Sequence, residues 1–281
     1  MVFLDSELSD EERGENARFV VIPMPLERTV SYGSGTANGP SAIIDASNEL
    51  ERFYNGAEPC EAGIATIAPI NCEGDLPSIM ERLAGACEQV SQEGKIPVTL
   101  GGEHSLTYGA VSGVARALNK KIGIIQIDAH ADLRIAYQGE KHSHASVMNL
   151  LTQDGHSLAQ FGVRALCRQE DQLRKERGVY FKDAQELVTQ NINSITLPAD
   201  FPKHVYVSFD VDGLDPSIMP ATGTPVPGGL GYYQALSIVQ SALQGRKCVG
   251  LDVVELAPNA QSAAWDFSAA QLTYALISMV E

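Results

Sequence analysis

The chain has 281 residues, of which 35 are Asp or Glu and 20 are Lys or Arg, giving a formal net charge of −15. A protein with this much negative charge would repel the phosphate backbone of nucleic acids, and we therefore expect no nucleic-acid partner. A small cationic substrate is mildly favoured by the same field. The length and ordinary hydrophobic content suit one large α/β domain, predicted over residues 1–281.

Cysteine usage and the N-terminal segment predict a cellular location. The five cysteines are scattered and form no C-x-x-C pair, which is typical of reduced thiols. Residues 1–15 are acidic and lack the apolar stretch of a signal peptide. No apolar run approaches the about 18 residues that a membrane span needs. We therefore expect a cytoplasmic protein without membrane contact.

The first half of the chain begins with a polar segment, residues 1–17, predicted to be a tail or a short surface helix. Apolar runs then predict strands at residues 19–23, 64–67, 96–100 and 122–127. Helical patterns lie between them, at about 40–53, at 76–93 and from just after His104 to about 117.

The second half continues the alternation of strands and helices. Strands are predicted at residues 160–165, 178–181, 204–209 and 248–255. Helices are predicted at 146–151, 231–243 and 262–280, and a helical segment follows each of the first two strands. Two long loops, about 133–145 and 215–229, are candidates for functional segments. This alternation predicts a mostly parallel sheet covered by helices on both faces.

Polar residues of metal-ligand type follow three of the predicted strands. The Ile-rich run at 122–127 ends in Asp-Ala-His-Ala-Asp, and the run at 204–209 ends in Asp-Val-Asp. Because parallel α/β sheets place their sites at the carboxyl ends of strands, these side chains are expected to converge. The strand ends offer four carboxylates and two imidazoles: His104, Asp128, His130, Asp132, Asp210 and Asp212.

These segments resemble three signatures of the ureohydrolases, the arginase–agmatinase family. The matching segments are GGEHS at 101–105, DAHAD at 128–132 and SFDVDGLDP at 208–216. Three further segments resemble family segments in the same order: 32–40, 222–225 and 252–258. The resemblance as a whole covers roughly residues 19–281. The resemblance implies a three-layer α/β/α fold, two Mn²⁺ per chain, and a homo-oligomer, commonly a trimer or hexamer. It also implies hydrolysis of a guanidino group to urea and an amine.

Carried over position by position, the resemblance assigns each ligand a role. Asp128 and Asp210 would bridge the two metals. One metal would be completed by His104 and Asp132, and the other by His130 and Asp212. All six positions match the family pattern, which argues against a catalytically dead relative.

The chemistry explains why these residue types are needed. A guanidinium carbon resists neutral water, and a divalent ion can lower the pKa of a bound water from about 16 to about 7. A hydroxide that bridges two ions could then attack the substrate carbon. Carboxylate and imidazole ligands without thiolate suit Mn²⁺, while Fe²⁺, Co²⁺ and Ni²⁺ stay open.

Two further residues resemble catalytic positions of the family. Glu255, at the end of the last strand, would hold the guanidinium through a charge-assisted contact. His144 would assist proton transfer to the leaving amine or contact the substrate, with His142 as the rival assignment.

The loop after Asp132 bears on the substrate. Arginases typically present Asn two positions past this aspartate, where this chain has Arg134 followed by apolar residues. The pattern resembles prokaryotic agmatinases, which predicts conversion of agmatine to urea and putrescine, a step of polyamine biosynthesis. If Arg134 faces the pocket, it could instead receive the carboxylate of 4-guanidinobutyrate. Arginase activity, a single-zinc deacetylase-like hydrolase and a non-enzymatic binding protein also stay open.

Overall fold

One sheet of eight parallel strands forms the centre of the computed structural model, which describes residues 1–280. Glu281, the last residue of the predicted domain, lies outside the described residues. The strand order is β2-β1-β3-β8-β7-β4-β5-β6. The strands are β1 (Phe19–Met24), β2 (Ile64–Thr66), β3 (Ile96–Gly101), β4 (Gly123–Ile127), β5 (Ser157–Phe161), β6 (Tyr180–Lys182), β7 (His204–Asp210) and β8 (Lys247–Val254).

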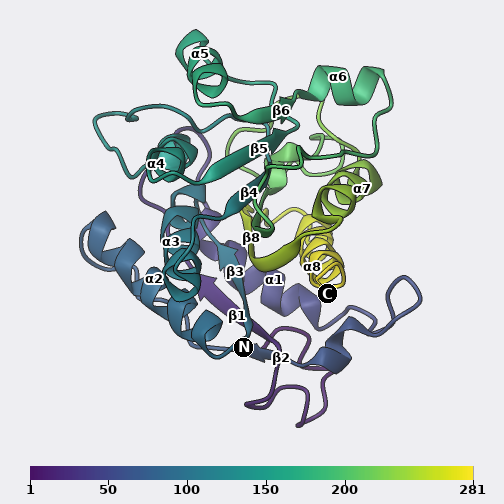
Figure 1. The fold of residues 1–281 in the computed structure, drawn as a ribbon. Coiled ribbons are helices and arrows are strands. Elements are labelled where there is room, and N and C mark those ends of the chain that lie inside the picture. The colour runs from purple at the N-terminus through teal and green to yellow at the C-terminus, as the bar shows by residue number, and fades with distance from the viewer. Residues whose placement is uncertain (281) are drawn as a thin grey trace.

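Helices cover both faces of the sheet, which gives three layers (Figure 1). The helices α2, α3 and α4 pack on one face, and α1, α7 and α8 pack on the other. The helices are α1 (Gly39–Ser47), α2 (Leu76–Gln92), α3 (Thr107–Leu118), α4 (Val147–Gln153), α5 (Arg168–Glu176), α6 (Ala184–Thr189), α7 (Tyr232–Leu243) and α8 (Ala264–Ile277). The predicted α/β/α architecture with a parallel sheet is therefore confirmed.

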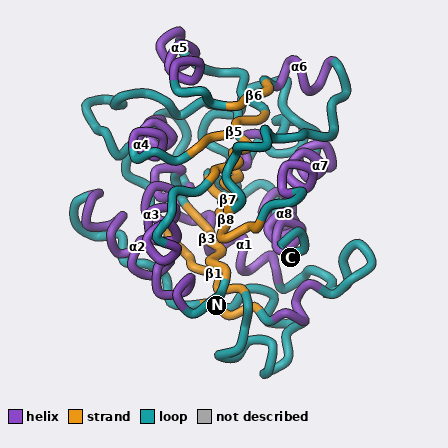
Figure 2. The backbone as a smooth tube through the Cα atoms, in the orientation of Figure 1, coloured by secondary structure: helices purple, strands orange, loops and turns teal. Residues whose placement is uncertain are grey.

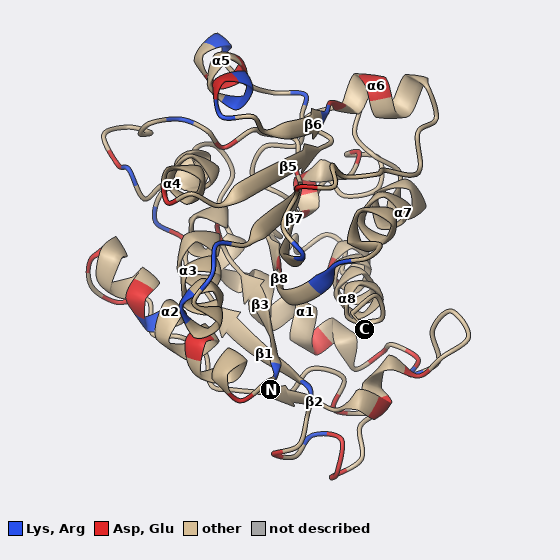
Figure 3. Ribbon diagram, viewed as in Figure 1, with Lys and Arg blue, Asp and Glu red and all other residues tan. Residues whose placement is uncertain are grey.

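The apolar strand runs explain why the sheet is central. All six residues of β1 and all five of β4 are buried, as expected for strands covered on both faces. Charged residues lie mostly on the outer helices and loops, and the strands carry few of them (Figure 3). Within residues 1–280, no helix combines the length and the apolar character needed to cross a membrane.

Local chemistry sets the helix ends. The Asp75 carboxylate accepts a hydrogen bond from the Ser78 backbone N–H at 2.9 Å and caps the start of α2. The helix predicted at 40–53 ends at Ser47, because the Ser47 hydroxyl and the Asn48 amide donate to the Ile44 carbonyl and compete with the next helical turn. The prediction was therefore too long by about one and a half turns.

Two other boundaries differ from the prediction. The strand expected at 160–165 lies at Ser157–Phe161, because Gly162 takes a left-handed conformation with φ of 94° and ends it. The segment 1–17 is not a polar tail: it contains turns but no helix or strand (Figure 2), and Phe3 and Leu4 are fully buried. Their backbone N–H groups donate to Thr66 and Ser47, which fixes the segment to the body.

Candidate metal centre and active site

The six predicted ligands and Glu255 lie at the carboxyl ends of four neighbouring strands, in the order β3, β8, β7 and β4, with Glu255 alone after β8. After β3 the chain continues outward through β4, β5 and β6, and it then returns to form β7 and β8 between β3 and β4. The direction in which successive strands are added to the sheet therefore reverses at this place. Open α/β sheets place their binding crevices at such reversals. The sheet therefore brings four chain segments, distant in sequence, to one edge.

The first ligand group surrounds His104, which begins a 3-10 turn (His104–Leu106) after β3. Its Nδ1 lies 2.9 Å from Asp132 Oδ2, 3.1 Å from Asp128 Oδ2 and 3.4 Å from Asp210 Oδ2. All four side chains are nearly inaccessible to solvent. His104, Asp128 and Asp132 are close enough together to share one ion.

The second group shares Asp128 with the first. His130 Nδ1 lies 3.0 Å from Asp212 Oδ2 and 3.5 Å from Asp128 Oδ1. His130, Asp128 and Asp212 are again close enough to share one ion. Because one oxygen of Asp128 faces each histidine, Asp128 is placed between the two groups.

Asp210, the other predicted bridge, is placed less symmetrically. Its Oδ2 approaches His104, and its Oδ1 accepts a hydrogen bond from the Asp212 backbone N–H at 2.8 Å. It belongs to neither three-residue group that could hold an ion. Its bridging role stays a prediction.

A serine and a carboxylate fix the tautomer of His104. The Ser208 hydroxyl donates to Asp252 at 2.8 Å and lies 2.8 Å from His104 Nε2. Since a hydroxyl has one proton, Nε2 must be the donor in this contact, and Nδ1 keeps its lone pair. His104 Nδ1 is buried and has no hydrogen-bond partner within residues 1–280. Such an orphaned nitrogen, facing carboxylate oxygens, is suited to a metal ion.

Two glutamines that sequence reasoning missed support Asp128. Gln126 Nε2 donates to Asp128 Oδ2 at 2.7 Å, and Gln160 Nε2 donates to the side-chain Oε1 of Gln126 at 2.6 Å. Both glutamines are fully buried. The sequence signal was a polar residue inside an otherwise apolar strand, two positions before the aspartate and so on the same face.

The electrostatics of the cluster favour added positive charge. Burial, together with the charge of Asp128, raises the pKa of Asp132 to about 7. Burial also raises the pKa of Asp210 well above its usual range, with contributions from Asp212 and Asp128. Burial lowers the pKa of His130, but its contacts with Asp128 and Asp212 outweigh this and raise it to about 12. These carboxylates therefore compete for protons unless cations neutralise them.

Glu255 lies beside the ligand groups, as predicted. It follows β8, is buried, and its Oε1 accepts a hydrogen bond from the His104 backbone N–H at 2.6 Å. Burial raises its pKa to about 8. Glu255 and Asp132 have positive φ values of 66° and 51°, a conformation that side chains other than glycine rarely adopt. Strained backbone of this kind clusters at functional sites.

His144 and His142 occupy different environments. His144 lines the cleft that also contains His130, Asp132 and Glu255. His142 packs edge-on against Tyr108 of α3 and lines neither cavity at the ligand groups. The structure thus brings His144, and not its rival, to the predicted site. Burial lowers the pKa of His144, which favours its neutral form.

A second chamber of about 430 Å³ continues outward from this cleft. The two share His130, Asp132 and His144, and the outer chamber adds Arg134, Tyr137 and other residues. Arg134 Nε lies 4.0 Å from Glu170 Oε2, and its guanidinium lies over the Tyr137 ring at 5.7 Å. Its side chain is 43% exposed. Arg134 therefore faces the chamber while lying close to a carboxylate.

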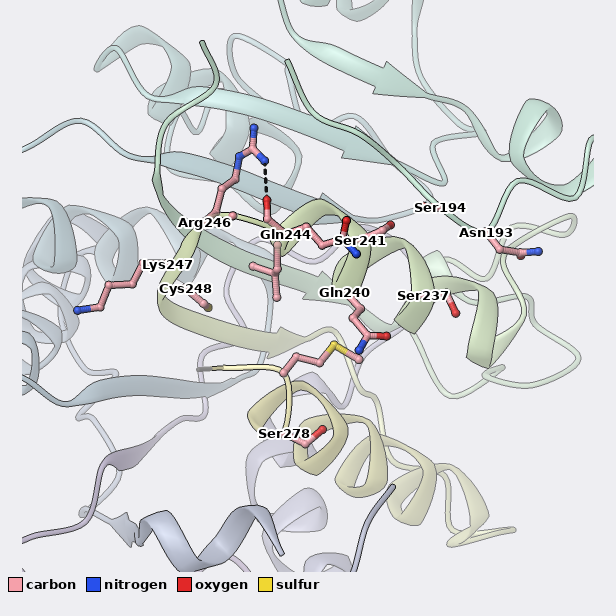
Figure 4. Close-up of a pocket in the computed structure, with 13 residues that line it drawn as sticks. Asn193, Ser194, Ser237, Gln240, Ser241, Gln244, Arg246, Lys247, Cys248 and Ser278 are labelled. Carbon is pink, nitrogen blue, oxygen red and sulfur yellow. Dashed lines mark hydrogen bonds between the residues drawn. The ribbon is translucent and has the colours of Figure 1, made fainter. Parts of the chain in front are cut away.

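A larger cavity, about 790 Å³, lies elsewhere, between the ends of α7 and α8 and the start of β8 (Figure 4). Its lining includes Ser237, Gln240, Gln244 and Arg246, and contains no carboxylate or imidazole. Such a lining cannot supply the ligand set described above. Size alone does not identify the site.

Comparison with known proteins identifies the family. The sequence model of the arginase family matches residues 17–278. The chain belongs to the arginase family. An N(1)-aminopropylagmatine ureohydrolase of Thermus thermophilus is 38% identical over 269 residues, 94% of this chain and 91% of that protein. The corresponding enzyme of Synechocystis is 35% identical over 276 residues, 93% of this chain and 89% of that protein.

Other arginase-family members are similar over nearly the whole chain. An agmatinase of Pyrococcus horikoshii is 31% identical over 274 residues, covering 94% of this chain and 93% of that protein. The crystal structure of the agmatine ureohydrolase of Thermoplasma volcanium superposes with a TM-score of 0.81 at 28% identity, covering 99% and 94% of the two chains. An arginase from Medicago truncatula gives 0.85 at 27% identity, covering 98% and 91%. The chain is thus a hydrolase of the agmatinase-like branch, acting on guanidino groups.

Proposed function

We propose that this arginase-family enzyme hydrolyses the guanidino group of agmatine to urea and putrescine, using two Mn²⁺ per chain. The observation that carries the proposal is the pair of ligand groups joined by Asp128, with Glu255 and His144 at the same cleft. The donor set fits divalent ions, because His104 presents an orphaned lone pair among carboxylates. When bound, the ions would supply a hydroxide nucleophile at neutral pH.

The residues around the ions would bind and orient the substrate. Glu255 would hold the guanidinium through its buried carboxylate, which also accepts a hydrogen bond from the His104 backbone N–H. His144, neutral and at the cleft, would accept a proton and return it to the leaving nitrogen. Asp128, Asp132 and Asp212 would hold the ions, with His104 and His130 completing each group.

The substrate proposal rests on the charges that the outer chamber presents to the far end of the substrate. Arginine carries an α-carboxylate, and burying that charge without a partner is costly. Arg134 lines the outer chamber, where it could meet such a carboxylate. Its Nε, however, lies 4.0 Å from Glu170 Oε2, so the Glu170 carboxylate already balances its charge. We therefore expect decarboxylated guanidino compounds to be preferred over arginine.

N(1)-Aminopropylagmatine is a second candidate, favoured by one feature of the site. The outer chamber of about 430 Å³ adjoins the cleft at the ligand groups and offers space for a tail longer than that of agmatine. Two relatives named for this activity are 35% and 38% identical, and another with that name is 31% identical, the same as the agmatinase. Both candidates share the guanidinium and a cationic tail, and the aminopropyl group lengthens that tail and adds one more ammonium.

Urea release from a panel of four compounds tests the proposal. The panel contains agmatine, N(1)-aminopropylagmatine, arginine and 4-guanidinobutyrate, each assayed with Mn²⁺. We expect kcat/KM for at least one decarboxylated cation to exceed that for arginine by about a hundredfold, or about 3 kcal/mol. Arginine or guanidinobutyrate as the best substrate would refute the proposed specificity. The same panel ranks the two favoured cations.

A further inference from the structure

A buried carboxylate next to the ligand groups is used by neither of them. Glu103 is fully buried and precedes His104 in the loop after β3. Four donors point at it: the backbone N–H groups of Arg28 and Thr29, at 2.5 and 2.6 Å, and the hydroxyls of Thr29 and Ser105, at 2.9 and 2.5 Å. A carboxylate accepts all four, since its two oxygens offer about four lone-pair sites.

The loop carrying Thr29 is tied to the Glu103 loop by backbone contacts. The Gly102 N–H donates to the Met24 carbonyl at 2.9 Å, and the Glu103 N–H donates to the Leu26 carbonyl at 2.8 Å. A Cβ on Gly102 would lie 2.0 Å from the Leu26 carbonyl oxygen, so the close approach requires glycine here. The position of Thr29 over Glu103 is therefore built into the fold.

Thr29 connects this carboxylate to His144. The Thr29 Oγ1 accepts a hydrogen bond from the His144 backbone N–H at 3.0 Å, and it lies 3.1 Å from His144 Nδ1. The single hydroxyl proton of Thr29 is directed to Glu103. Oγ1 can then only accept from Nδ1, so the ring carries its proton on Nδ1 and its lone pair on Nε2.

The ring orientation is held from a second side. Tyr137 packs edge-on against His144, with ring centroids 5.3 Å apart and an angle of 72° between the planes. Nε2 has no hydrogen-bond partner within residues 1–280, and His144 lines both the inner cleft and the outer chamber. The lone pair is thus available on the substrate side of the ring.

We propose that Thr29 and Glu103 are positioning residues that hold His144 in the Nδ1–H tautomer, so that Nε2 is the proton acceptor during hydrolysis. The arrangement mirrors the Ser208–Asp252 pair, which holds His104 in the opposite tautomer. As water forms a C–O bond to the guanidino carbon, Nε2 takes a proton from that water, and the Nδ1–H to Thr29 contact is retained with the Glu103 carboxylate behind it. The proton on Nε2 then passes to the leaving nitrogen as the C–N bond breaks. The kinetic role rests on the proposed function, whereas the tautomer does not.

Solid-state NMR of protein with 15N-labelled histidine rings measures the tautomer directly, in enzyme supplemented with diamagnetic Mg²⁺ in place of Mn²⁺. The His144→Gln variant identifies the signals of His144 among the six histidines. We expect wild-type His144 to be protonated on Nδ1, and Thr29→Val to shift it to Nε2–H or to a mixture. Ser105→Ala, which removes another donor to the same Glu103 oxygen without touching His144, should keep the Nδ1–H form.

Kinetics with Mn²⁺ on the best guanidino substrate give the second readout. Thr29→Val should lower kcat by about ten- to a hundredfold with KM changed less than kcat, and Thr29→Ser, which keeps the hydroxyl, should recover most of that loss. An Nε2–H tautomer in the wild-type enzyme overturns the proposal, as does a Thr29→Val variant with full kcat. If wild type releases no urea from any compound, the proposed function fails while the NMR result still decides the tautomer.

Discussion

Asp128→Asn tests the shared carboxylate at the centre of the two ligand groups. Asp128 is fully buried, with Oδ2 at 3.1 Å from His104 Nδ1 and Oδ1 at 3.5 Å from His130 Nδ1. The substitution keeps the shape but removes the charge, and it turns an NH₂ group toward one of the two groups. A single residue change is therefore expected to weaken both metal sites.

The magnitude follows from the two contacts. Losing one charge-assisted contact costs about 1.5–3 kcal/mol, so each ion should bind roughly ten- to a hundredfold more weakly. Metal content after dialysis, measured by mass spectrometry, should fall below that of the wild type, and urea release should fall with it. Asp154→Asn is the matched control, because its exposed carboxylate accepts a hydrogen bond from the Tyr108 hydroxyl at 3.0 Å and is part of neither ligand group.

The two variants separate a specific effect from a general one. Asp154→Asn should keep the metal content and turnover of the wild type. If Asp128→Asn also retained stoichiometric metal and full turnover, Asp128 could not lie between two ions. Equal losses in both variants would point to general destabilisation instead.

Three further predictions concern charge at the same site. Glu255→Gln should keep the metals bound and lower kcat/KM by roughly ten- to a hundredfold, because about 1.5–3 kcal/mol of guanidinium binding is lost; unchanged kcat/KM returns Glu255 to a structural role. Arg134→Ala should lower the hydrolysis of 4-guanidinobutyrate and leave that of agmatine equal or higher; equal effects on both compounds would show that Arg134 does not act on the substrate tail. Mn²⁺ should raise Tm relative to chelated protein, and more at about pH 8 than at about pH 6. The sign follows from Asp132, whose pKa in the folded protein is raised to about 7. As the pH rises through that value, the metal-free protein loses the stability that the protonated carboxyl gives it. The deprotonated carboxylate can then bind a metal ion, so the gain in Tm from Mn²⁺ grows with pH. A Tm difference that is absent, or that shrinks with pH, contradicts this reasoning.

The sequence predicted the sheet well because burial on both faces leaves a strong local signal. Ile124, Ile125 and Ile127 mark β4, and the other central strands have similar apolar runs. The N-terminal segment was misjudged, because Phe3 and Leu4 are too few to form a periodic pattern. Their burial depends on contacts with Ser47 and Thr66, which only the folded chain brings near.

The candidate ligands were identified from their spacing, whereas their pairing, His104 with Asp132 and His130 with Asp212, came from the family resemblance. Spacing alone placed Asp128, His130 and Asp132 on one face of an extended strand. In the structure, Asp132 turns into a left-handed conformation and meets His104, while His130 meets Asp212. The residues that orient the histidines were missed, because such contacts join positions such as Thr29 and His144, 115 residues apart. A homo-oligomer, expected from the family resemblance, stays a prediction.

Two divalent ions, held by the residues around Asp128, are proposed to support hydrolysis of a decarboxylated guanidino substrate. Urea release from agmatine and N(1)-aminopropylagmatine, with chelated enzyme titrated with Mn²⁺, measures whether both ions are needed. We predict no turnover without metal, and full turnover at about two ions per chain. Saturation at one ion per chain, or turnover that survives chelation, would contradict the account.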